Sequence, residues 1–162
     1  MRDPRSVSYP SSYYDDQWCL KPPLLLWIAV AYLSRTITLP IVMALGHFAG
    51  VDSRAIESFH AFWRLDGLVP SLIAAAVLYA LCRRVPTASK PVRWIWTHGR
   101  VFLAVSASLD AVLALIDWLK ETAQIDDPSL LSLTAMAIDL YFLVYVLAAR
   151  RVRHAFCEFP AA

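Results

Sequence analysis

Four long apolar stretches set what this chain can fold into. They run over 24–48, 68–82, 92–119 and 130–149. A helix that crosses the hydrocarbon core of a bilayer, about 30 Å thick, needs about 20 mostly apolar residues. The stretch 68–82 is the short one, because it spans about 23 Å at 1.5 Å per residue. The pattern predicts an all-α integral membrane bundle of four transmembrane helices.

The amino-acid composition argues against most other classes of protein. The chain is 59% hydrophobic and 17% charged, whereas a soluble domain is about 45–50% apolar and about 25% charged. Its four glycines and net charge of +2 argue against a glycine-rich phosphate site and against a nucleic-acid partner. A soluble four-helix bundle is the alternative, but its helices would show a polar face, and the stretch 24–32 is apolar all round.

The polar segment between the first two stretches has an amphipathic pattern. Its apolar side chains share one helical face: Ala55, Ile56, Phe59, Phe62 and Trp63. We expect a short helix in the membrane interface here, because such a helix buries one apolar face among the lipid headgroups. Asp66 is placed to cap the second span, and Pro70 fits its first turn.

Basic residues predict the orientation. Arginine and lysine concentrate in cytoplasmic loops, and here ten of them lie in the N-terminal segment 1–23, the connection 83–93 and the C-terminal segment 150–162. Three, Arg54, Arg64 and Lys120, lie on the other side. We therefore expect cytoplasmic tails over 1–23 and 150–162, with the membrane domain over 24–149 and an uncleaved first span.

Three ionisable residues fall deep inside the predicted spans. Arg35 lies about 16 Å into the first span and Asp139 about 14 Å into the fourth, from opposite ends. Such groups usually face the interior of the bundle and pair with one another. We expect an Arg35–Asp139 ion pair, with Asp110 of the third span as a further partner. Two interpretations stay open: a pair that fixes helix packing, and a proton or ion relay.

The third span carries a line of small residues, at Ala104, Ala107, Ala111 and Ala114. Small side chains let membrane helices approach closely, so the span is predicted to be the central helix. In the first span, Pro40 removes a backbone donor and predicts a kink near Thr36.

The sequence offers no metal or cofactor site. Cys19, Cys82 and Cys157 match no metal or redox spacing, and we expect reduced thiols near the cytoplasmic face. A haem would need opposed imidazoles at matched depth, which His47, His60, His98 and His154 do not supply. The polar cluster of His60, Trp63, Arg64 and Asp66 is a weak catalytic candidate, since an interfacial helix carries such residues anyway.

Two regions resemble a known family. The first contains Tyr13-Tyr14-Asp15-Asp16, Leu20-Lys21-Pro22-Pro23-Leu24, Trp27 and Ser34-Arg35-Thr36; the second runs from Leu140 through the basic exit at 150–154 to Phe159-Pro160. Together they resemble the YfeZ-like family of small bacterial inner-membrane proteins, which carry a domain of unknown function. The resemblance spans nearly the whole chain and implies a multi-pass protein of the bacterial inner membrane. It brings no catalytic residue.

Three functions are compatible with these features. The first is a non-enzymatic accessory or scaffold subunit that contacts membrane lipids and binds another membrane protein or a second copy of itself. The second is a small transporter or proton-linked channel that uses Arg35, Asp110 and Asp139. The third is a membrane enzyme that acts on lipid or quinone.

Overall fold

The computed structural model describes residues 9–14, 19–48, 67–123 and 130–160. Within these ranges the regular structure is helical, apart from one isolated bridge between Tyr14 and Leu20. The elements in chain order are the 3-10 turn η2 (Ser11–Tyr13), α1 (Leu24–Leu33), α2 (Arg35–Phe48), α4 (Leu68–Cys82), α5 (Lys90–Ala123), α6 (Leu130–Ala148) and α7 (Arg150–Cys157).

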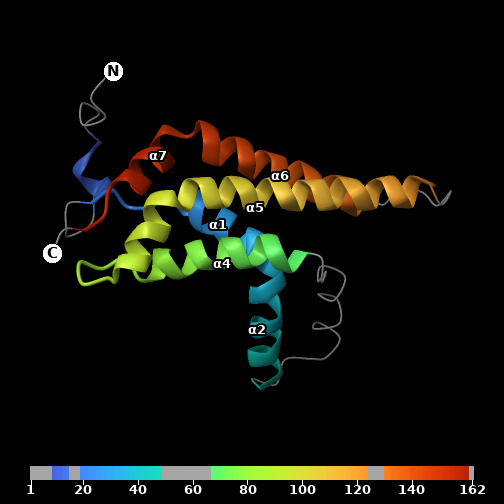
Figure 1. Cartoon of the computed structure of the whole chain (residues 1–162), viewed down its shortest axis with the longest axis horizontal. Helices are drawn as coiled ribbons and strands as arrows, with labels where there is room; N and C mark the ends of the chain where they lie inside the picture. The colour runs from blue at the N-terminus through green and yellow to red at the C-terminus, as the bar shows by residue number, and fades with distance from the viewer. Residues whose placement is uncertain (1–8, 15–18, 49–66, 124–129, 161–162) are drawn as a thin grey trace.

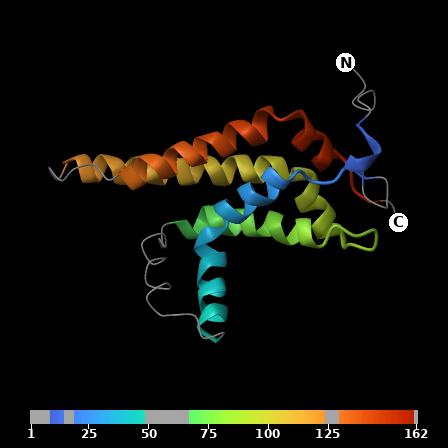
Figure 2. The ribbon, with the colours of Figure 1, turned by 180° about the vertical axis from the view of Figure 1, so that it is seen from behind.

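Helix α5 organises the bundle. It packs against α6 on one side and against α4 on the other, while α1 lies between them (Figure 1). The same arrangement is seen from behind in Figure 2. The core contains Leu26, Leu33, Val77, Leu103 and Val146, all of them almost fully buried. Many other apolar side chains of α4, α5 and α6 face outward.

Only part of the bundle meets the length and composition of a membrane span. The stretch Lys90–Lys120 of α5 does so alone. Two bent pairs do so only if each pair counts as one span: Leu24–Leu33 with Arg35–Leu45, and Leu133–Ala148 with Arg150–Cys157. Helix α4 is apolar but shorter, with 15 residues. By length and composition, the described residues therefore contain one helix that could cross a membrane, or up to three if each bent pair counts as one.

The helix expected over 24–48 is broken. Helix α1 has 10 residues, and α2 leaves it at an angle of 87°. Figure 1 shows α2 standing away from the other helices. The kink was expected near Thr36 because of Pro40, but Pro40 lies inside α2 and the break is at Ser34. Ser34 has φ −90° and ψ 10°, so the break is local to this residue and is not made by the proline ring.

The segment expected as a C-terminal tail is a folded helix. Helix α7 turns by 64° from α6 and packs against α5 with Val152, Ala155 and Phe156 buried. The turn occurs because α7 is amphipathic: one face is apolar, and Arg150 and Arg153 on the other face are exposed. Gly99 of α5 allows the close approach, since a Cβ there would lie 2.5 Å from the Phe156 ring.

The end of the N-terminal segment is also folded, against the same end of the bundle. Leu20 is 1% exposed. Its backbone N–H donates to a carboxylate oxygen of Glu158 at 2.8 Å, and its carbonyl accepts from Arg84 at 3.0 Å. The interfacial helix expected over 55–63, and the cap expected at Asp66, lie outside the described residues. Helix α4 starts after Gly67.

A buried charge centre at the helix break

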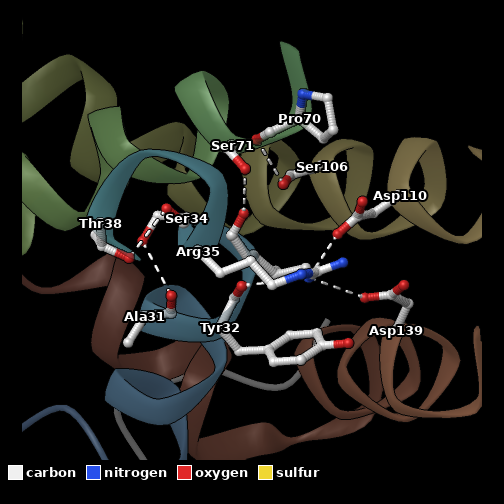
Figure 3. Close-up of polar contacts among 11 residues, drawn as sticks. Ala31, Tyr32, Ser34, Arg35, Thr38, Pro70, Ser71, Ser106, Asp110 and Asp139 are labelled. Atoms are coloured by element: carbon white, nitrogen blue, oxygen red, sulfur yellow. Dashed lines mark hydrogen bonds and ion pairs between the residues drawn. The ribbon is translucent and has the colours of Figure 1, made fainter. Parts of the chain in front are cut away.

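The break between α1 and α2 brings three charged side chains together. Arg35 is the first residue of α2, Asp110 lies in the middle of α5, and Asp139 lies in the middle of α6. Nη1 of Arg35 is 2.8 Å from Oδ2 of Asp110 and 3.8 Å from Oδ1 of Asp139. Figure 3 shows the guanidinium between the two carboxyl groups. We call these three residues the charge centre.

The expected partner was Asp139, with Asp110 as a further one. The structure places both beside Arg35, but Asp110 is the nearer acid. The reason is the break itself. A straight helix over 24–48 would carry Arg35 along the axis of α1, whereas the turn at Ser34 starts α2 next to the first turn of α4, and α4 packs along α5.

Hydroxyl groups make the break possible. The last carbonyls of a helix have no partner within the helix, and a buried unpaired carbonyl is costly. Here the hydroxyl of Ser34 donates to the carbonyl of Ala31 at 3.2 Å, and the hydroxyl of Ser71 donates to that of Leu33 at 3.1 Å. Nη1 of Arg35 donates to the carbonyl of Tyr32 at 3.3 Å. Side-chain donors thus supply hydrogen bonds to the last carbonyl groups of α1.

The first turn of α2 is also held by hydrogen bonds, which meet at the carbonyl of Ser34. The Ser34 carbonyl accepts the backbone N–H groups of Ile37 and Thr38, both at 3.0 Å, and the Thr38 hydroxyl at 3.1 Å (Figure 3). The Arg35 guanidinium also lies over the ring of Tyr32, 4.3 Å from its centroid. This cation–π contact adds to the forces that hold the two helices at their angle.

Helix α4 begins against the charge centre. A Cβ at Gly67 would lie 2.9 Å from the Thr36 hydroxyl and 4.0 Å from Oδ1 of Asp110, so the absence of a side chain allows this approach. One turn further, the Pro70 carbonyl accepts the hydroxyl of Ser106 of α5 at 2.8 Å. Ser71 and Ser106 are almost fully buried, and they tie α4 to α1 and to α5.

The two acids have different surroundings. Asp110 is 7% exposed and lies near the first residues of α2 and α4. Helix N-termini carry a partial positive charge. Asp139 is fully buried in the middle of α6. Among the described residues, neither of its oxygens has a hydrogen-bond partner, so Arg35 at 3.8 Å is its ionic contact.

The predicted line of small residues faces the interior. Ala107, Ala111 and Ala114 are buried, and Ala104 is half-buried. Helix α5 is in contact with α1, α4, α6 and α7. Small side chains on this helix leave room for close neighbours, which is how both acids can reach one guanidinium.

The charged residues of the centre were predicted from the sequence, and Ser106 was placed on the same polar face as Asp110, but the hydrogen bonds of the hydroxyl groups were not predicted. Ser34, Ser71 and Ser106 were readable as polar residues in apolar stretches, but nothing in their spacing shows which carbonyl each would meet. Tyr32 and Gly67 were missed for the same reason. The signal that could have found the serines is their position inside apolar stretches. A hydroxyl group that is removed from water has to donate a hydrogen bond to another group.

The other sequence candidates lie away from the charge centre. Cys82 and Cys157 are exposed free thiols, and Cys19 is buried. His98 is exposed, and its Nδ1 lies 3.0 Å from the Trp94 carbonyl; Nδ1 of His154 lies 3.1 Å from the hydroxyl of Tyr9. The cluster His60 to Asp66 lies outside the described residues. Across the parts of the chain that are described, no group of His, Cys, Asp or Glu side chains is arranged for a metal ion.

The sequence has one recognisable relationship. No curated protein and no solved structure matches the chain. The sequence model of one family, described as "Protein of unknown function (DUF2919)", matches residues 9–158. The match begins at Tyr9 and ends at Glu158, and both residues contact the other end of the chain through His154 and Leu20. The chain therefore belongs to this family of proteins of unknown function.

Proposed function

We propose that the protein is a multi-pass component of the bacterial inner membrane, as its resemblance to the YfeZ-like proteins implies. Helices α5 and α6 supply two of the four proposed spans, the bent α1–α2 pair supplies a third, and the shorter apolar helix α4 supplies the fourth. Support comes from the distribution of charge. The basic side chains of the loop 83–90 and of α7 lie at one end of the bundle, whereas Asp117 and Lys120 lie towards the other end of α5. This asymmetry favours cytoplasmic placement of both chain ends.

Reporter fusions test this placement. A cytoplasmic reporter fused after Ala162 is expected to be active, and a reporter that works only in the periplasm is expected to be inactive there. A second pair of fusions after Ala123, at the end of α5, should give the opposite result. An active periplasmic reporter after Ala162 would overturn the orientation.

Within the membrane we infer a non-enzymatic accessory or scaffold role, in which the protein binds another membrane protein or a second copy of itself. The observation that carries this role is helix α2. It contacts α1 and α4 at its start and then leaves the bundle, with Ile41, Val42 and Leu45 more than half exposed. An apolar helix that projects sideways offers a partner more surface than a helix in the bundle does.

A bulky substitution on α2 tests this role. Val42→Trp should reduce the recovery of cross-linked partners from native membranes, because tryptophan is tolerated by lipid but blocks close helix packing. Val144→Trp is the matched control, since Val144 on α6 is equally exposed, at 61%. The mass of the particle in mild detergent separates a second copy from a different partner. A monomeric particle with no cross-linked partner would contradict the role.

A second candidate, a proton-linked transporter or channel, is favoured by one observation. Helix α1 ends in the bundle beside two acids and an arginine, and broken helices beside buried charges are typical of ion and substrate sites in transporters. Proteoliposomes that contain the purified protein should then show a proton flux that depends on Asp139. The absence of such a flux would contradict this second candidate.

A further inference from the structure

The charge centre is unbalanced as a set of ionised groups. It contains one guanidinium, which stays protonated in proteins, and two carboxyl groups. If both acids were ionised, the centre would carry one net negative charge in a site that is almost closed to water. Two carboxyl groups that share a buried site do not both ionise readily, and one of them takes up a proton instead.

The surroundings decide which acid keeps its charge. Asp110 receives the Arg35 guanidinium at hydrogen-bonding distance and lies close to the beginnings of α2 and α4. All three are sources of positive potential. Asp110 is therefore the acid whose negative charge is compensated.

Asp139 has none of this support. Its side chain is 0% exposed, and the nearest guanidinium nitrogen lies at 3.8 Å, too far for a hydrogen bond. The groups that face it are Arg35 from α2, Asp110 from α5 and Tyr32 from α1, whose ring packs against Phe142 on the next turn of α6. The Ser71 hydroxyl of α4 donates to the carbonyl of Leu33. On α6 itself, Tyr141 and Tyr145 lie within two turns.

We propose that Asp139 is a proton-binding site. One proton binds to one of its carboxylate oxygens, which leaves the Arg35–Asp110 ion pair balanced. When the proton leaves, Arg35 faces two ionised carboxylates. Its Nη1, which contacts Asp110, also donates to the carbonyl of Tyr32. The loss of the proton therefore acts on the contact that holds the end of α1. This inference rests on the proposed membrane placement and deepens the second candidate function.

Infrared spectroscopy of the full-length protein in lipid nanodiscs tests the site. The carbonyl stretch of a protonated carboxyl group is separate from the bands of a carboxylate. We expect this band at neutral pH, and we expect it to disappear reversibly at alkaline pH. Asp139→Asn should abolish the band while the protein keeps its fold, because the neutral amide imitates the protonated acid. Asp117→Asn is the matched control and should leave the band unchanged, since Asp117 pairs with Lys120 at 3.6 Å near the end of α5.

A second measurement locates the proton. The thermal unfolding midpoint of Asp139→Asn should stay close to that of the native protein, and that of Asp110→Asn should fall. The proposal is overturned if the band is absent in the native protein, if it survives in Asp139→Asn, or if Asp110→Asn is the variant that unfolds normally. A band whose titration depends on sodium concentration would also overturn it, because the site would then hold a metal cation. None of these results depends on the fusions or on the proton flux, so the topology and the transporter function can each fail separately.

Discussion

At the scale of single residues, the charge centre shows how a helical bundle can hold an arginine in its interior. Arg35 donates to Asp110 and to the Tyr32 carbonyl, and its guanidinium lies on the Tyr32 ring. Each contact replaces part of the water that the cation has lost. The sequence allowed the prediction that Arg35 must meet an acid, because a lone charge in a span is costly. It did not allow the choice between Asp110 and Asp139, because that choice depends on where the helix breaks.

A double-mutant cycle measures the Arg35–Asp110 pair. Arg35→Leu alone leaves Asp110 without its cation and should lower the free energy of unfolding, but by less than the roughly 3–5 kcal/mol of a stranded charge, because the acid can take up a proton. The double variant Arg35→Leu with Asp110→Leu should recover much of this loss, because a buried pair can be replaced by apolar groups at little cost. Denaturant unfolding in detergent micelles gives both values. The exposed Asp117–Lys120 pair is the control, with an expected coupling below about 1 kcal/mol. Additive effects at Arg35 and Asp110 would contradict the pairing.

At the scale of elements, hydropathy located three helices well and misjudged one. The apolar stretch 68–82 coincides with α4, and α5 and α6 match their stretches within a few residues. The stretch 24–48 looked continuous because Ser34 is small and hydropathy averages over it. What breaks the helix is the supply of donors from elsewhere, Ser71 of α4 above all, and a tertiary hydrogen bond leaves no trace in local hydropathy.

The hydroxyl of Ser71 should therefore stabilise the break. Ser71→Ala leaves the Leu33 carbonyl without this donor, and an unpaired buried acceptor costs about 1–3 kcal/mol. Ser108→Ala is the matched control, because Ser108 lies on the exposed side of α5 and should change stability by less than about 0.5 kcal/mol. Thermal unfolding of the purified variants compares the two. Equal stability of Ser71→Ala and Ser108→Ala would show that the break does not need this hydrogen bond.

At the scale of the whole molecule, segments far apart in sequence close one end of the bundle. The indole N–H of Trp96 donates to the carbonyls of Ala155 and Glu158, and Arg84 donates to the carbonyls of Leu20 and Glu158. The basic segments were interpreted as two cytoplasmic tails and a cytoplasmic loop because charge counting treats arginine only as a marker of side. Arg84 and Arg93 instead donate to carbonyls and lie over the rings of Trp96 and Phe159. A count of charges contains no information on these contacts.

Glu158 is one of the residues through which the two ends of the chain meet, and its carboxylate should protect the N-terminal segment. Glu158→Ala removes the acceptor of the Leu20 N–H. We expect the Leu20 amide to exchange its hydrogen about tenfold faster, which corresponds to about 1.4 kcal/mol of lost local stability. Glu158→Gln is the matched control, because its amide oxygen can still accept the bond, so most of the protection should persist. Hydrogen exchange of the intact protein in micelles, followed by mass spectrometry of the peptide over 19–26, gives the rates. If both variants exchange at the native rate, the closed end is held by packing of Leu20 and α7 alone, and the carboxylate has no part in it.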